Sequence, residues 1–301
     1  MIRPPHGSAV GAGGPPPGAE AVREALGAVG SWPAAASAGA VVPGGGGATV
    51  TAGAADRPFA WASVTKVLTA MAIWVAVEEG TVTWDDPAGP PGATLVHLLA
   101  HASGLAPDSD AVLAPPGTRR IYSNRGIEIA AAHLEAAAGM PFVEYLAAAI
   151  LEPLDMTTTE LRGSPAAGAW GTLSDLLALG RQLLSPTVVH RSTLAHATSP
   201  AFPGLAGVLP GFGRQDPNDW GLGVEIRGHK APHWTGRCNS PATFGHFGQA
   251  GGFLWVDPAA GVALASLGER PFGPWAADAW PALSDAVLAA GLTTREDRPA
   301  P

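Results

Sequence analysis

The chain has 301 residues, of which 47 % are hydrophobic and 14 % are charged, and its formal net charge is −8. This composition provides enough apolar side chains for a buried core and excludes a chain that is disordered throughout. No basic run appears that could neutralise phosphates, which argues against nucleic-acid binding. We therefore expect one catalytic unit made of two closely packed lobes.

The N-terminal segment, residues 1–18, is rich in Gly and Pro and lacks the apolar stretch of a secretory signal. We interpret it as a disordered leader and expect a cytoplasmic protein. The longest apolar run, residues 67–77, is shorter than the roughly 20 residues needed to cross a bilayer, so no membrane span is expected. The single Cys238 has no partner for an internal disulfide, which fits a reducing compartment.

The predicted elements change in kind twice along the chain. Residues 19–32 have the pattern of a short amphipathic helix, and two strands joined by a glycine-rich loop follow at residues 36–42 and 48–53. The pattern is then helical, with helices expected at residues 63–79, 94–100, 124–138, 141–150 and 173–184. Strands are expected again at residues 221–228, 245–258 and 261–269, before a last helix at residues 280–290.

Strands at both ends with helices between them predict a sheet assembled from distant segments. We expect an α/β (α+β) fold in which an antiparallel sheet is flanked by helices and carries an inserted helical lobe. The catalytic domain is predicted at residues 19–301, with an α/β lobe at about 19–62 and 205–292 and a helical lobe at about 63–204. A cleft between two lobes is a natural place for a site.

The stretch FAWASVTKVLTAMAIWVAVEEG places Ser63 three residues before Lys66, one of only two lysines in the chain. At helical spacing the two side chains project from the same face, and the helix N-terminus leaves backbone N–H groups free for an oxyanion. A desolvated lysine can have a pKa low enough to activate a serine nucleophile. The pair by itself is weak evidence, because such a spacing also arises by chance.

Two further stretches contain polar groups that could transfer protons or bind a substrate beside Ser63. In RRIYSNRGIEIA, the Tyr122 hydroxyl is a candidate general acid or base and the Asn124 amide a candidate donor, although Ser123 or Asn124 could equally be a helix N-cap. In FGHFGQAGG, His246 and Gly248 lie at the start of a strand, where a missing side chain lets a ligand approach the backbone. His246 could also be an ordinary core histidine.

In this order, the three stretches resemble the serine β-lactamase and penicillin-binding-protein superfamily, in the branch of class C β-lactamases, D-alanyl-D-alanine peptidases and related esterases. The resemblance extends from about Ala35 onward and includes LVHLLAHASGL, PPGTRRIYSN and AWGTLSDLLALG. It implies a β-lactamase/transpeptidase-like fold and an acyl-enzyme on Ser63, with no cofactor and no metal. The expected partner is a small ester or amide substrate; the oligomeric state stays open.

The resemblance also implies roles for individual residues. Lys66 lowers the proton affinity of Ser63, Tyr122 shuttles the proton, and Asn124 holds substrate and lysine. His246 occupies the place of the third-motif lysine, and the amides of Ser63 and Gln249 form the oxyanion hole. His101 and Ser103 are implied to fix a loop.

The third motif departs from the Lys-Thr-Gly of class C β-lactamases, because His246-Phe247-Gly248 stands in its place. Both the cation and the hydroxyl that grip a β-lactam carboxylate are thereby weakened, so we expect a carboxylesterase-like hydrolase of small esters. We also expect residual β-lactam acylation to rise as His246 protonates, near pH 6.5 for an unperturbed ring. β-Lactamase, D-alanyl-D-alanine peptidase, acyltransferase and silent binding functions remain alternatives.

Two other classes of hydrolase lack support in the sequence. No serine has glycine at both flanking second positions, as the nucleophile elbow of an α/β-hydrolase requires. A metal hydrolase is not indicated either, since the chain contains no His-Glu-x-x-His motif and His229 and His233 have no evident further ligands.

Overall fold

The computed structural model of the chain describes residues 18–43 and 47–296. The predicted leader, residues 1–18, therefore lies outside the described residues except for Gly18. No single described helix is long and apolar enough to cross a membrane; one pair of helical segments, Asn124–Ala138 and Phe142–Leu151, meets the length and composition test only jointly and is bent by 87°.

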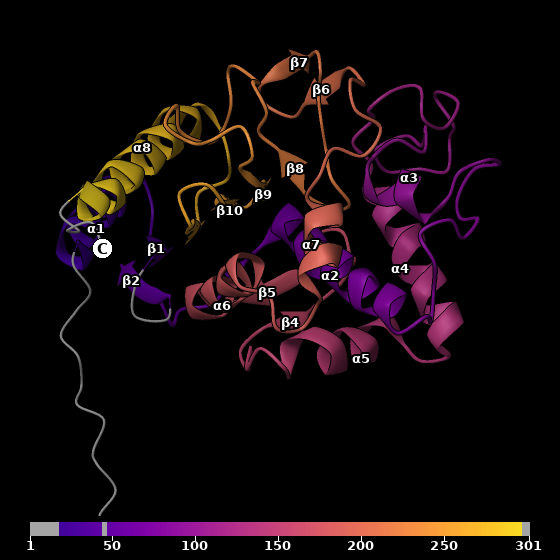
Figure 1. Ribbon diagram of the computed structural model, residues 1–301, viewed down its shortest axis with the longest axis horizontal. Coiled ribbons are helices and arrows are strands. Elements are labelled where there is room, and N and C mark those ends of the chain that lie inside the picture. The colour runs from indigo at the N-terminus through magenta and orange to yellow at the C-terminus, as the bar shows by residue number, and fades with distance from the viewer. Residues whose placement is uncertain (1–17, 44–46, 297–301) are drawn as a thin grey trace, which may run out of the picture.

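A six-stranded antiparallel sheet occupies one side of the molecule, and most of the helical lobe lies beside it (Figure 1). Its spatial order is β2-β1-β11-β10-β9-β8. The strands are β1 (Ala36–Val42), β2 (Ala48–Ala52), β8 (Glu225–Ile226), β9 (Phe244–Gly248), β10 (Gly252–Asp257) and β11 (Val262–Gly268). Because β1 pairs with β11, with Ala38 opposite Ser266, the two ends of the chain meet within one sheet, as the sequence predicted.

Residues 245–258, predicted as one strand, form most of the hairpin β9–β10, and this expectation was wrong. The chain turns at Gly251, whose φ is 107°, and a Cβ atom there would lie 1.9 Å from the carbonyl oxygen of Arg270. Only glycine adopts this conformation in so close a contact. Gln249 follows directly after Gly248, the last residue of β9, and so lies between the two strands of the hairpin.

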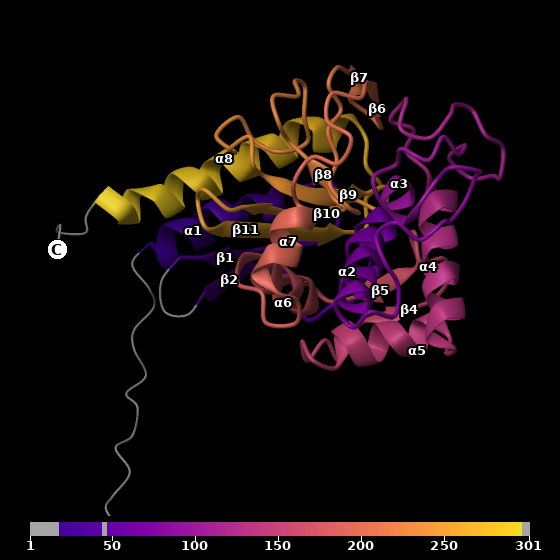
Figure 2. The same cartoon turned by 45° about the vertical axis from the view of Figure 1, so that its right-hand side comes forward.

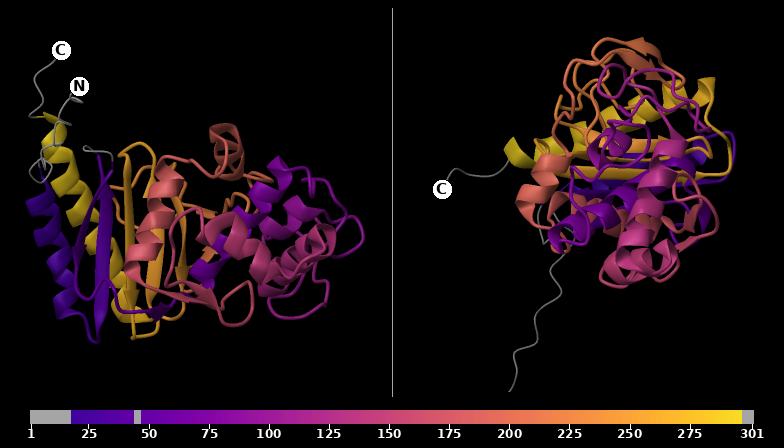
Figure 3. Two further views of the ribbon diagram at one scale, coloured as in Figure 1. Left: turned by 90° about the horizontal axis from the view of Figure 1, so that it is seen from below. Right: turned by 90° about the vertical axis from the view of Figure 1, so that its right-hand side faces the viewer.

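Both faces of the sheet are covered by helices (Figures 2 and 3). Alternate residues point to opposite faces of a strand, so Phe253 and Trp255 of β10 pack with α1 (Ala19–Leu26) and α8 (Pro274–Glu296), whereas Leu254 and Val256 join the cluster that contains α6 (Leu173–Leu184). The helix α6 lies within the predicted helical lobe by sequence but packs on β1, β10 and β11. The helix α8 is longer than predicted and contains Pro281.

The helical lobe surrounds α2 (Thr65–Glu78), which is buried on all sides from Thr65 to Ala76. It contacts α4 (Asn124–Ala138), α5 (Phe142–Leu146) and α7 (Arg191–Ala197). The remaining elements are η1 (Gly27–Ser31), β3 (Phe59–Ala60), η2 (Ala62–Val64), α3 (Leu95–Leu99), η3 (Ala147–Leu151), β4 (Glu160–Leu161), β5 (Ala169–Gly171), β6 (Gly207–Leu209) and β7 (Gly213–Gln215). The sequence did not predict α7 or the five short strands among these elements.

Candidate active site

Ser63 lies in the short helix η2, immediately before α2 and against the end of β9. The preceding residue, Ala62, has a φ of 45°, a left-handed conformation that is rare for alanine and is often found at functional sites. Thr65 Oγ1 donates to Ala62 O at 2.6 Å and accepts from Ala169 N at 2.9 Å, and Trp61 N donates to Ala169 O at 2.9 Å. These bonds to β5 hold the tight turn that presents Ser63.

Lys66 is fully buried, and its ammonium nitrogen lies 3.2 Å from Ser63 Oγ. Two further oxygens surround Nζ: Asn124 Oδ1 at 2.6 Å and the carbonyl oxygen of Ala166 at 2.9 Å. Burial lowers the pKa of Lys66 to about 7, although the negative charges of Asp108 and Glu128 act in the opposite direction. A substantial fraction of Lys66 is therefore neutral near pH 7.

The three oxygens around Lys66 Nζ suit both protonation states of the amine. A neutral amine has two N–H bonds and one lone pair. The carbonyl oxygens of Asn124 and Ala166 can act only as hydrogen-bond acceptors. In the neutral form these two oxygens take both N–H bonds, and the lone pair is then free to accept the Ser63 hydroxyl proton, whereas the ammonium form donates to all three oxygens. The geometry thus prepares Lys66 to remove the proton from Ser63.

Tyr122 and Asn124 reach Ser63 and Lys66 from the start of α4. Ser123 is the N-cap of this helix: its Oγ accepts from Gly126 N at 3.0 Å, which leaves the Asn124 amide available to the site. Asn124 Nδ2 donates to Asp108 Oδ1 at 2.7 Å, and this bond turns Oδ1 toward Lys66. Ser123 therefore takes the N-cap role that the sequence left open for either residue, and Asn124 contacts Lys66 as an acceptor, not as the predicted donor.

The phenol of Tyr122 lies under the lysine, with Lys66 Nζ 4.7 Å from the ring centroid. Burial raises the pKa of Tyr122 above its usual value, and a hydrogen bond to Ser63 opposes this shift only in part. Tyr122 therefore keeps its proton at neutral pH. It can act as a proton donor, whereas the general base has to be Lys66.

His246 faces the site from β9 as a neutral imidazole. Its Nδ1 lies 2.7 Å from the carbonyl oxygen of Phe247, so Nδ1 carries the hydrogen and donates it. Burial and the nearby charge of Lys66 lower the pKa of His246 to about 3. The value near 6.5 expected for an unperturbed ring therefore does not apply to His246, because the ring is buried beside the charge of Lys66. Its Nε2 is a buried acceptor without a partner.

Gly248 and Gln249 end β9 beside the nucleophile. A Cβ atom on Gly248 would lie 2.3 Å from the carbonyl oxygen of Trp61, so glycine is required by the packing of β9 against the Ser63 turn. This differs from the predicted reason, which was the approach of a ligand. Gln249 lines the same pocket as Ser63, and its amide stays the predicted second oxyanion donor.

His101, which the resemblance implied to fix a loop, packs against the ring of Tyr122. Its Nδ1 accepts from Ser123 N at 3.1 Å, and its ring lies 4.6 Å from the rings of both Tyr122 and Trp220. Burial holds the pKa of His101 well below its usual range. The residue is a positioning group for the Tyr122 segment, as the resemblance implied.

A small pocket lies beside Ser63, and the empty space in it and in the open solvent at its mouth amounts to about 350 Å³. Its wall is largely apolar and aromatic, and comprises Ser63, Tyr122, Leu209, Pro210, Trp220, Glu225, Trp234, His246, Phe247 and Gln249. A larger, open groove of about 1400 Å³ shares Tyr122 and Pro210 with this pocket and is also lined by Asn124. The site thus has one narrow compartment and one wide compartment on either side of Tyr122.

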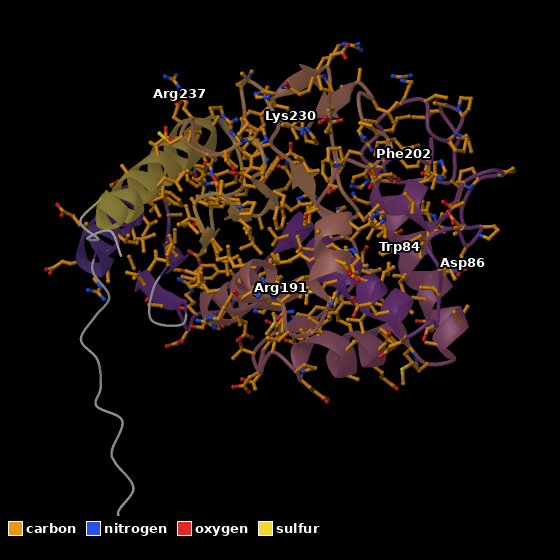
Figure 4. All side chains as sticks on the ribbon, viewed as in Figure 1. Trp84, Asp86, Arg191, Phe202, Lys230 and Arg237 are labelled. Atoms are coloured by element: carbon orange, nitrogen blue, oxygen red, sulfur yellow. The ribbon has the colours of Figure 1, made fainter. Side chains whose placement is uncertain are left out.

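Glu225 is a wall residue that the sequence analysis missed. It is 1 % exposed and accepts hydrogen bonds from Trp234 Nε1 at 2.7 Å, from His233 Nε2 at 2.9 Å and from Lys230, marked in Figure 4. Burial alone raises the pKa of Glu225, but the charges of His233 and Lys230 outweigh it and lower the pKa to about 2. The rarity of lysine was the available signal, since Lys230 is the second of two.

His233 is thus engaged by Glu225 and by Thr235 Oγ1, 2.8 Å from its Nδ1. Within the described ranges 18–43 and 47–296, no three His, Cys, Asp or Glu side chains are grouped so as to hold a metal ion.

Comparisons with known proteins place the chain in a family. The family profile described as Beta-lactamase matches residues 32–288. A crystal structure of a beta-lactamase from Mycobacterium bovis is 55 % identical, with a TM-score of 0.86, over 89 % of this chain and 99 % of that one. The comparison with curated proteins gave no match.

More distant structures share the fold. A simvastatin synthase from Aspergillus terreus is 17 % identical, with a TM-score of 0.74, over 92 % of this chain and 96 % of that one. EstCE1, described as a hydrolase with promiscuous acyltransferase activity, is 17 % identical, with a TM-score of 0.73, over 90 % of this chain and 98 % of that one. The chain belongs to the beta-lactamase family and is a serine hydrolase. The resemblance seen in the sequence is confirmed.

Proposed function

We propose that this serine hydrolase cleaves small carboxylic esters through an acyl-enzyme on Ser63. The observation that carries the proposal is the state of His246. A neutral ring that donates its one hydrogen to Phe247 can neither pair with a carboxylate nor donate to it. Uncharged acyl esters need no such partner, whereas the carboxylate of a penicillin or cephalosporin does.

The contacts around Ser63 support a two-step reaction. Neutral Lys66 takes the hydroxyl proton as Oγ attacks the ester carbonyl, and the N–H groups of Ser63 and Gln249 receive the oxyanion. Collapse of the tetrahedral intermediate breaks the bond to the leaving oxygen, which Tyr122 can protonate while Lys66 returns its proton to Tyr122. Water then repeats the sequence on the acyl-enzyme and releases the acid. The wide groove beside Tyr122 gives the leaving group and the water a route.

The substrate preference gives a direct test. We expect kcat/KM for p-nitrophenyl butyrate to exceed that for nitrocefin by about two orders of magnitude at neutral pH, the upper end of what a charge-assisted hydrogen bond contributes. Because the pKa of His246 is about 3, nitrocefin turnover should gain nothing as the pH falls from 7 to 5. Steady-state kinetics on both substrates measure this. Efficient nitrocefin turnover at pH 7 would favour a β-lactamase instead.

The pH dependence of ester hydrolysis tests Lys66 as the base. We expect kcat/KM to rise with pH through a midpoint near 7, because the amine must be neutral to accept the Ser63 proton. Asp108→Asn removes a negative charge that raises the pKa of Lys66, so the midpoint should move to lower pH. Asp110→Asn, the same change two residues further along the exposed loop, is the matched control. A profile that stays flat from pH 5 to 9, or an equal midpoint in wild type and Asp108→Asn, contradicts this assignment.

A further inference from the structure

The narrow pocket beside Ser63 contains two buried polar atoms without hydrogen-bond partners. One is Nε2 of His246, and the other is Nε1 of Trp220. Both residues line the pocket and are almost fully buried, at 3 % and 2 % exposure. Their rings are neighbours, with centroids 5.4 Å apart and planes at 69°. A buried polar atom without a partner is costly and rare in folded proteins, which indicates that something else completes the pair.

The two atoms have opposite hydrogen-bonding character. Nε2 of His246 is an acceptor because Nδ1 holds the hydrogen, and the indole Nε1 of Trp220 can only donate. A group that contacts both atoms, each of which exposes less than 1 Å² in the free protein, must therefore donate and accept at once. A hydroxyl does both. A carboxylate lacks the hydrogen for Nε2, an ammonium lacks the lone pair for the indole, and an alkyl chain leaves both atoms unpaired.

The other polar groups of the wall are already occupied. Both carboxylate oxygens of Glu225 accept hydrogen bonds, from Lys230, His233 and Trp234. Trp234 uses its only donor in this way. The rest of the wall beyond the catalytic groups and Gln249 is Leu209, Pro210 and Phe247. Apart from the catalytic groups and Gln249, an acyl group in the pocket therefore meets an apolar surface with one further polar position, formed by His246 and Trp220.

We propose that this pocket selects acyl groups that carry a hydroxyl, which donates to Nε2 of His246 and accepts from Nε1 of Trp220. The inference rests on the proposed ester hydrolysis, since it places the acyl group in the narrow pocket and the leaving group in the wide groove. The preferred substrates are short hydroxyacyl esters.

Matched esters test the proposal on the wild-type protein. The p-nitrophenyl esters of 2- and 3-hydroxybutyrate, in both enantiomers, are compared with the 2- and 3-fluorobutyrates and with butyrate. Fluorine is close to hydroxyl in size and electron withdrawal but cannot donate a hydrogen bond. We expect one hydroxy ester to exceed its fluoro counterpart about tenfold in kcat/KM, the ratio that one well-formed hydrogen bond supports.

Three variants identify the residues responsible for the ratio of kcat/KM between the hydroxy and the fluoro ester. His246→Ala and Trp220→Phe each remove one partner, so the hydroxy-to-fluoro ratio should fall toward one. Trp234→Phe removes similar area from the same wall without removing an unpaired donor, so it should keep the wild-type ratio whatever it does to the rates. A wild-type ratio near one at both positions, or a ratio that survives both substitutions, overturns the proposal.

The same measurements distinguish a failure of the proposed hydroxyl preference from a failure of the proposed ester hydrolysis. If butyrate is hydrolysed through Ser63 but no hydroxy ester is preferred, the hydroxyl position is wrong and ester hydrolysis stands. If none of the esters acylates Ser63, both proposals fail.

Discussion

Ser63→Ala is expected to abolish ester hydrolysis, with a loss of about 10⁴-fold or more in kcat, the scale seen when a catalytic nucleophile is removed. The reason is geometric: among the described residues, Ser63 is the serine whose hydroxyl lies by the Lys66 nitrogen, at 3.2 Å. Steady-state hydrolysis of p-nitrophenyl butyrate measures the loss. Intact-mass spectrometry after exposure to a fluorophosphonate should show one adduct on the wild type and none on Ser63→Ala.

Ser123→Ala is the matched control for the nucleophile. Ser123 is also a serine within the site region, but its Oγ donates to Ala106 O at 2.7 Å and caps α4. Its removal should lower stability by about 1 kcal/mol, as loss of an N-cap does, while the adduct still forms. An adduct of undiminished yield on Ser63→Ala would assign the nucleophile elsewhere.

Lys66→Ala and Tyr122→Phe are expected to reduce kcat/KM by about 10²- to 10⁴-fold each, the usual contribution of a general acid–base group. The double variant should be little worse than the more damaged single variant. Lys66 takes the Ser63 proton and Tyr122 passes it on, so the loss of either group interrupts the same transfer. Kinetics of the three variants on one ester measure the coupling.

Two outcomes would contradict this shared pathway. Fully multiplicative losses in the double variant would mean that Lys66 and Tyr122 act independently. A Tyr122→Phe variant with wild-type kinetics would remove the phenol from the mechanism. Because Lys66 is completely buried, circular dichroism of Lys66→Ala must first show a folded protein; Lys66→Met, which keeps the length of the side chain, provides a second test of the same position.

Local spacing determined much of this protein from the sequence alone. Helix 124–138 begins at its predicted residue because Ser123 is an N-cap, and it ends before Gly139, which adopts a left-handed φ of 67°. Helix 173–184 was also predicted to the residue. The spacing of Ser63 and Lys66 placed their side chains together because three residues form nearly one helical turn.

Only the tertiary structure decided the chemistry of those side chains. Lys66 has a pKa near 7 because distant residues bury it, and one of its hydrogen-bond partners, Ala166, lies 100 residues away. His246 is a neutral acceptor because the fold buries it beside Lys66 and directs Nδ1 to Phe247. Trp220 joins His246 in the pocket wall through folding alone. Protonation and hydrogen bonding depend on burial and on long-range neighbours, and neither is encoded in local spacing.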